Sequence, residues 1–208
     1  MHEQAKLFTI FGKVALPEYF KNKRVLDVGS GDINGNNRFL FEQCQYDGND
    51  VVKAKNVTIV SKTKDLPFED SSFDTIISTE CFEHDPEYKE SIKKIYKMLK
   101  PGGLFLFTCA STGRAEHGTR RTSPKNSYGT IAKLEDMVDY YKNLTEIDLN
   151  CAINLNQSFS SWNTYYNGTS KDLYFIGIKG ESDSNSTKKL PEYTAHAVVN
   201  TSNNVPIE

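Results

Sequence analysis

Residues 24–31 read Arg-Val-Leu-Asp-Val-Gly-Ser-Gly, and this stretch decides the fold. Its apolar residues suit a buried parallel strand, while Gly29 and Gly31 allow positive φ and close approach of a ligand to the backbone. We expect a helix to begin near 34–37, with its free N–H groups facing the same ligand. The stretch therefore predicts a cofactor cradle, with an ordinary tight turn as the alternative.

A second strand, expected at 46–50, strengthens this interpretation because it ends in a carboxylate. Asp50 follows the glycines at about 20 residues, the spacing at which an acid reaches a ribose hydroxyl. A ligand that carries adenosine is therefore favoured.

Nicotinamide cofactors and S-adenosylmethionine both carry adenosine, and two residues separate them. The dinucleotide fingerprint requires a third glycine where this chain has Asn34. Asp27, in the strand before the glycines, would repel a pyrophosphate but suits a ligand with a sulfonium and an ammonium group.

At this point the chain resembles the class I S-adenosylmethionine-dependent methyltransferases, and the resemblance covers roughly residues 24–110. It implies an α/β, Rossmann-like fold in which a seven-stranded, mostly parallel sheet carries helices on both faces. In that family an acid followed by leucine holds the adenine, a role that falls here on Asp65 and Leu66; a surface turn closed by Pro67 is the alternative. The cofactor-binding residues that we expect are Asp27, Gly29, Ser30, Gly31, Asp50, Asp65, Leu66 and Thr79.

Hydrophobic periodicity and helix-capping residues predict the remaining elements. Three parts are expected: an N-terminal helical cap (1–22), the methyltransferase domain (23–180) and a polar C-terminal tail (181–208). The expected strands after the first are 46–50, 56–60, 73–78 and 104–109, and the expected helices are 6–19, one from 38, 86–100 and one from 130. The resemblance to the family implies two further strands, at 145–149 and 173–178, which would complete the seven-stranded sheet.

A group of acids and imidazoles follows the fourth strand. Glu80, Glu83 and His84 stand at i, i+3 and i+4, so in a helical turn they would share one side, and His117 on a later loop would complete a set for Mg, Mn or Zn. The pattern is similar to that of ubiquinone-pathway O-methyltransferases and small-RNA 2′-O-methyltransferases. This similarity implies a metal ion that binds both oxygens of a vicinal pair of hydroxyls on the acceptor. Simple helix capping is the alternative. The catalytic candidates are His84, His117 and Glu80.

Two further regions are candidates for acceptor binding. The loop 111–129 contains Arg114, Arg120 and Arg121, either as a clamp on an anionic acceptor group or as a solvated surface. Trp162 and nearby tyrosines would line a pocket or pack as core, and the sequence leaves both open.

Composition limits the class of protein. The chain has 208 residues, a formal net charge of −2 and 38% hydrophobic residues, which fits one globular domain and makes nucleic-acid binding unlikely. The four scattered cysteines suggest reduced thiols in a cytoplasmic protein, and we expect neither a secretory signal nor a membrane span.

We therefore expect a methyltransferase that acts on a hydroxyl, or less favourably an amine, of a small-molecule, sugar-like or glycan-precursor acceptor. Ribose 2′-O-methylation at an RNA end and a non-catalytic cofactor-binding module are the alternatives, and a nicotinamide oxidoreductase is more distant.

Overall fold

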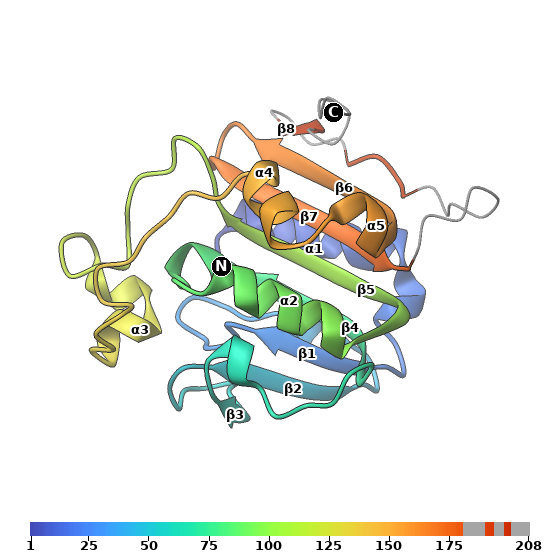
Figure 1. The fold of residues 1–208 in the computed structure, drawn as a ribbon, viewed down its shortest axis with the longest axis horizontal. Coiled ribbons are helices and arrows are strands. Elements are labelled where there is room, and N and C mark those ends of the chain that lie inside the picture. The colour runs from blue at the N-terminus through green and yellow to red at the C-terminus, as the bar shows by residue number, and fades with distance from the viewer. Residues whose placement is uncertain (181–189, 194–197, 201–208) are drawn as a thin grey trace.

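A mixed sheet forms the centre of the protein in the computed structural model, which describes residues 1–180, 190–193 and 198–200 (Figure 1). The strand order is β3-β2-β1-β4-β5-β7-β6-β8. The strands are β1 (Arg24–Val28), β2 (Gln45–Asp50), β3 (Ile59–Val60), β4 (Phe73–Thr79), β5 (Leu99–Ala110), β6 (Phe159–Asn167), β7 (Asp172–Lys179) and β8 (Val198–Asn200).

Strands β1 to β5 are parallel, and β7, β6 and β8 add antiparallel pairs. The expected seven-stranded, mostly parallel sheet is confirmed, and β8 extends it by three residues of the C-terminal segment. The strand order reverses between β1 and β4, and in open α/β sheets a crevice forms at that point, beyond the carboxyl ends of the strands.

Helices cover both faces of the sheet, as expected. Helix α1 (Glu3–Ala15) lies on one face, and α2 (Tyr88–Met98), α4 (Glu146–Ala152) and α5 (Leu155–Ser158) lie on the other (Figure 1). Alternation along β5 divides the core, because Leu104 and Leu106 belong to the cluster under α1, whereas Phe105 and Phe107 belong to the cluster under α2. Each buried aromatic or aliphatic side chain contributes about 1.5–3 kcal/mol.

Helix α2 fixes the direction of the chain beside the crevice. Asp85 precedes it and accepts hydrogen bonds from the Glu87 amide (2.8 Å) and the Ser91 hydroxyl (2.6 Å). Ile92 and Ile95 are buried on its inner face, and strand β5 begins directly after it at Leu99, five residues earlier than expected.

Two expected elements have a different structure. The expected strand 145–149 is instead helix α4, because Thr145 and Asp148 form a capping box and Glu146 and Leu149 bury one helical face. The sixth strand is formed by residues 159–167, a segment for which no strand was expected.

Two expected helices are reduced to single turns. The segment expected to form a helix from residue 38 makes only a 3-10 turn, Arg38–Leu40. The helix expected from 130 is the short α3 (Tyr128–Ile131), which long connections place at one end of the molecule in Figure 1. Ile131 in this turn is half exposed.

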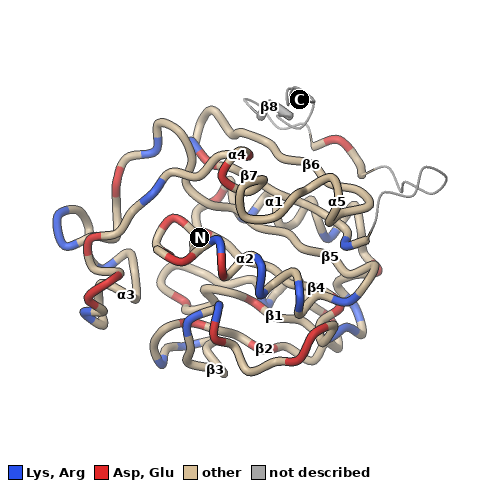
Figure 2. Tube along the Cα trace, in the orientation of Figure 1, with Lys and Arg blue, Asp and Glu red and all other residues tan. Residues whose placement is uncertain are grey.

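Charge is distributed without a dominant sign. Figure 2 shows basic and acidic positions interspersed along the described trace, in keeping with the net charge of −2. Within the same residues, no helix is both long and apolar enough to cross a membrane. Most of the expected C-terminal tail, 181–189, 194–197 and 201–208, lies outside the described residues.

Candidate functional site

A cavity lies at the carboxyl ends of β1, β2 and β4, where the strand order reverses. It encloses about 1230 Å³ of empty space, counting its opening to solvent. Its walls come from the start of α1, the loop after β1, the turns after β2, β3 and β4, and the segment around α3. Distant parts of the sequence therefore meet around one space of the size that ligands occupy.

The two glycines after β1 lie so close to neighbouring atoms that a side chain at either position would clash with them. Gly29 has φ +69°, and a Cβ atom there would lie 2.5 Å from Sγ of Cys81. A Cβ atom on Gly31 would lie 2.2 Å from the Tyr128 ring and 2.6 Å from Oδ2 of Asp50. Both positions therefore require glycine, and the backbone itself forms this cavity wall. Ser30, between them, is buried and also lines the cavity.

Asp27 is buried at the base of the cavity and fully engaged with the protein. Its Oδ1 accepts a hydrogen bond from Nδ2 of Asn37 (3.1 Å), and its Oδ2 accepts one from the Tyr46 hydroxyl. Burial raises the pKa of Asp27 to about 6, although the two hydrogen bonds oppose this shift. A cationic ligand bound nearby would offset the free-energy cost of burying the negative charge of Asp27.

Asp50 and Thr79 also line the cavity. The Asp50 carboxylate accepts hydrogen bonds from the amides of Gly31 (3.0 Å) and Val51 (2.7 Å), and burial raises its pKa. Asn37 connects this side of the cavity to β4, because its Nδ2 also donates to Oγ1 of Thr79 (3.2 Å). The structure thus brings together six of the expected cofactor residues: Asp27, Gly29, Ser30, Gly31, Asp50 and Thr79.

The other two expected cofactor residues lie outside the cavity. Asp65 is exposed, and Leu66 is packed in the core beneath α2. Residues 61–63 line the cavity instead, because β3 ends at Val60 and the chain directly after it faces the carboxyl edge of the sheet. Within this segment, Nζ of Lys62 contacts Oε2 of Glu87 at 2.9 Å.

The expected set of four metal ligands separates into two groups. Glu80 has φ +53°, so it does not continue into the 3-10 turn Phe82–His84. Its carboxylate instead accepts a hydrogen bond from Oγ1 of Thr108 (2.9 Å) and lies 3.2 Å from Nε2 of His2. Glu83, His84 and His117 form the other group.

Glu83 and His84 of the second group are buried, His117 is half-buried, and several polar atoms of Glu83 and His84 lack hydrogen-bond partners. The Glu83 side chain has no exposed surface, and neither carboxylate oxygen has a hydrogen-bond partner of normal geometry. Nε2 of His117 lies 4.0 Å from Oε1 of Glu83, and the ring centroids of His84 and His117 are 5.0 Å apart. Burial, with the nearby charge of Glu80, raises the pKa of Glu83 well above its usual range. Burial, with His117, lowers the pKa of His84 to about 3.

The expected acceptor-binding residues are dispersed. Arg114 lines the cavity, but Arg120 is an exposed partner of Asp139, and Arg121 is bound to Glu116 (3.0 Å) and Asp139 (3.4 Å). Trp162 lies on β6, packs against the core and donates from Nε1 to Oδ1 of Asn156 (3.2 Å). These contacts favour the surface interpretation for Arg120 and Arg121 and the core interpretation for Trp162.

Sequence reasoning missed several residues of the cavity wall. His2, Asn37 and Tyr128 line it from segments that the sequence places far from one another. A local signal existed for Asn37, which lies in the segment after the glycines. No local pattern marks His2 or Tyr128, because their positions depend on tertiary packing.

Residues 26–107 match the family model described as a methyltransferase domain. Among curated relatives, the chain is 42% identical over 53 residues to phosphoethanolamine N-methyltransferase 2 of Caenorhabditis elegans, covering 26% of this chain and 12% of that protein. It is 29% identical over 104 residues to a fatty-acid O-methyltransferase of Mycolicibacterium smegmatis, covering 43% of this chain and 38% of that protein. The chain spans less than half the length of these relatives.

Among solved structures, the fold is similar to that of 1,6-didemethyltoxoflavin-N1-methyltransferase of Burkholderia thailandensis, which was solved with S-adenosylhomocysteine. The TM-score is 0.53 at 15% identity, and the match covers 81% of this chain and 76% of the other. At this identity the likeness shows the fold alone.

Proposed function

We propose that this chain, a member of the class I S-adenosylmethionine-dependent methyltransferases, transfers a methyl group from S-adenosylmethionine to a hydroxyl of a small-molecule or sugar-like acceptor. The observation that carries the proposal is the cavity at the switch point of the sheet, with a glycine backbone wall, the buried carboxylate of Asp27 and the half-buried carboxylate of Asp50. An amine acceptor is the less favoured form of the same reaction.

The residues of the cavity fit this cofactor. Asp27 is an acid at the base of the cavity, where a carboxylate suits a cationic ligand and opposes a phosphate. Asp50 accepts two amide hydrogen bonds, which orient its carboxylate at the spacing expected for a ribose. When bound, S-adenosylmethionine supplies an electrophilic methyl group whose leaving group is a neutral thioether. The protein must therefore orient the acceptor and accept its proton.

His117 is the proton acceptor that we propose. Its Nδ1 lies 3.1 Å from the carbonyl oxygen of Ala115, which can only accept a hydrogen bond. Nδ1 therefore carries the hydrogen of the neutral ring, and Nε2 has a free lone pair. The second imidazole, His84, stays neutral at physiological pH because burial lowers its pKa to about 3. An imidazole lone pair beside the cavity can accept the proton that a hydroxyl loses on methylation.

A divalent cation is the alternative to a free imidazole in this proposal, because Nε2 of His117 cannot bind a cation and accept a proton at the same time. Glu83, His84 and His117 each offer a ligand atom, and these atoms lie within 4.8 Å of one another. The unpartnered oxygens of Glu83 are consistent with a missing ligand. Glu80 is outside this group, so the candidate set is three residues. When bound, such a cation would lower the pKa of an acceptor hydroxyl.

The names of the relatives support a small-molecule acceptor without fixing it. They include fatty-acid and tocopherol O-methyltransferases, a phosphoethanolamine N-methyltransferase and sterol C-methyltransferases. The cytoplasmic location remains part of the proposal and is supported by four cysteines that form no disulfide.

Turnover of labelled cofactor with separate panels of diols, amines and a short RNA tests the proposal. We expect methylation of a diol or another hydroxyl compound. Methylation of the RNA alone would favour ribose 2′-O-methylation, and cofactor binding without turnover would favour a binding module. Removal of metal with a chelator, followed by addition of Mg, Mn or Zn, tests the cation. If a cation is required, wild-type turnover should be lost on chelation and regained on addition. The Glu83→Gln variant should not show this loss and recovery.

A further inference from the structure

The first turn of α1 forms one side of the cavity. Met1 and His2 line it, whereas the helix from Ala5 onward packs on the sheet. Ala5 and Phe8 have no exposed surface, and the Phe8 ring stacks on Tyr174 with ring centroids 4.6 Å apart. Residues 1–4 are therefore the part of the N-terminal segment that the apolar face of α1 does not hold in place.

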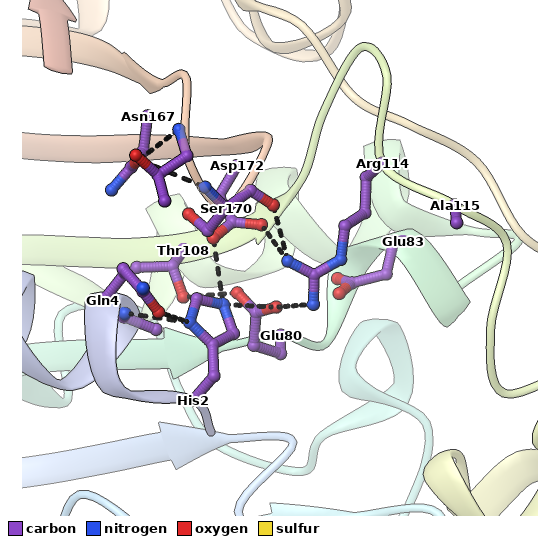
Figure 3. Close-up of polar contacts among 12 residues, drawn as sticks. His2, Gln4, Glu80, Glu83, Thr108, Arg114, Ala115, Asn167, Ser170 and Asp172 are labelled. Atoms are coloured by element: carbon purple, nitrogen blue, oxygen red, sulfur yellow. Dashed lines mark hydrogen bonds and ion pairs between the residues drawn. The ribbon is translucent and has the colours of Figure 1, made fainter. Parts of the chain in front are cut away.

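His2 holds this part by contacts with two acidic residues from distant strands (Figure 3). Its Nε2 lies 3.2 Å from Oε2 of Glu80, directly after β4, and 2.9 Å from Oδ2 of Asp172, at the start of β7. Its Nδ1 lies 3.0 Å from Oε1 of Gln4. One imidazole thus connects the start of α1 to two strands across the edge of the cavity.

The charged residues around His2 favour its protonated, cationic form. Asp172 has no exposed surface, and Nη1 of Arg114 lies 3.1 Å from its Oδ1 (Figure 3). The two carboxylates of Glu80 and Asp172 therefore face two cations, Arg114 and a protonated His2. Burial lowers the pKa of His2, but the adjacent carboxylates of Asp172 and Glu80 outweigh this effect and raise the pKa to about 10. Loss of one cation would leave buried carboxylate charge uncompensated.

We propose that His2 is a positioning residue that fastens residues 1–4 across the cavity as a strap, and that this strap opens when the adenosyl ligand enters or leaves. The proposal rests on the proposed function, because it takes the cavity to hold S-adenosylmethionine. The fastening itself is a property of the protein without ligand. The two parts are therefore separable by experiment.

The variant His2→Gln tests the strap, because glutamine keeps hydrogen-bonding capacity but carries no charge. His2→Lys restores a cation. Lys13→Gln is the matched control, since it removes the ion pair of Lys13 with Glu42 (2.8 Å) at the other end of the same helix. All are made in the full chain with a C-terminal tag, and thermal unfolding verifies that each folds.

Hydrogen exchange of residues 3–8 without ligand measures the fastening. Loss of the ion pairs of His2 with Glu80 and Asp172 predicts about tenfold faster exchange in His2→Gln. We expect partial recovery in His2→Lys and no change in Lys13→Gln. Wild-type exchange in His2→Gln would overturn the strap.

The rate at which S-adenosylhomocysteine is released, measured by stopped flow, tests whether the strap opens when the ligand leaves. We expect release from His2→Gln to be about tenfold faster, in proportion to the loosened strap. Faster exchange with unchanged release would overturn the gating role, leaving His2 merely structural. If no variant or wild type binds S-adenosylhomocysteine, the proposed function fails, and the exchange comparison still decides whether His2 fastens residues 1–4.

Discussion

The hydroxyl of Tyr46 on β2 donates a hydrogen bond to the carboxylate of Asp27 on the neighbouring strand β1. The same carboxylate accepts a second hydrogen bond from Asn37, yet burial still raises its pKa to about 6. The protein therefore holds a carboxylate whose charge is disfavoured until a cation arrives. Functional sites commonly combine such destabilisation with ligand binding.

The first prediction concerns the pH dependence of stability in Asp27→Asn. The folded-state pKa of Asp27 lies above its unfolded value of 3.8, so the folded protein binds more protons between these values. The Asp27 contribution to stability therefore falls as pH rises from about 4 to about 6, by up to roughly 3 kcal/mol. Asparagine does not titrate, so the stability of the variant relative to wild type should increase over this window.

Urea unfolding of both proteins without ligand at pH 4 and pH 7 measures this difference. Equal differences at the two pH values would show that Asp27 does not have a raised pKa.

The second prediction concerns Tyr46→Phe. The substitution removes one of the two hydrogen bonds that favour the charged carboxylate of Asp27, so the pKa of Asp27 should rise further. We expect about tenfold weaker binding of S-adenosylmethionine at pH 7, because hydrogen bonds to charged groups contribute about 1.5–3 kcal/mol. Binding measured at several pH values should recover toward wild type as the pH increases; a pH-independent loss would contradict this cause.

The third prediction concerns Gly31→Ala. The new methyl group would lie within 2.6 Å of both the Tyr128 ring and Oδ2 of Asp50, so the cavity wall must shift. We expect destabilisation of about 1–3 kcal/mol, the usual cost of overpacking, together with loss of cofactor binding. Gly102→Ala is the control, because a Cβ atom there meets nothing within 4 Å, although its φ of +74° imposes backbone strain. Retained cofactor affinity in Gly31→Ala would place the ligand elsewhere.

The fourth prediction separates chemistry from binding at His117. His117→Ala removes the proposed proton acceptor, and we expect turnover to fall by about 10²–10⁴-fold. Affinity for S-adenosylhomocysteine should stay close to wild type, since the cofactor residues are untouched. A change in affinity with unchanged turnover would assign His117 to binding instead.

The fifth prediction tests the arginines that the structure places outside the cavity. Arg120 is largely exposed and paired with Asp139, so Arg120→Ala should change stability by less than about 1 kcal/mol. Turnover should equal that of wild type. A large loss of turnover would restore the anion clamp as the correct interpretation of this loop.

The part of the site that could be predicted from sequence is local in the chain. Strand β1, its two glycines and Asp50 have short-range signals in the sequence: an apolar run, the glycine pair itself and a fixed spacing. The family resemblance assigned adenine binding to Asp65 and Leu66, which lie outside the cavity in the structure. The expected β3 ended at the correct residue, Val60, but the chain reaches the cavity directly after it.

The rest depends on contacts between distant segments. The expected grouping of Glu80 with Glu83 assumed a continuous helical turn, but the left-handed backbone at Glu80 directs its carboxylate toward His2. The strand expected at 145–149 came from analogy with the family, and the capping box of Thr145 and Asp148 favours a helix instead. Packing of α1 on β7, which positions His2, has no signature in the local sequence.

The central claim is that the cavity at Asp27 holds a positively charged methyl donor. Calorimetric titration of the wild type with S-adenosylmethionine, compared with Asp27→Asn and with a nicotinamide dinucleotide, tests it most directly. We expect one molecule of S-adenosylmethionine to bind per chain, weaker binding to the variant and no binding of the dinucleotide. Binding of the dinucleotide alone, or equal binding of S-adenosylmethionine to both proteins, would contradict the account.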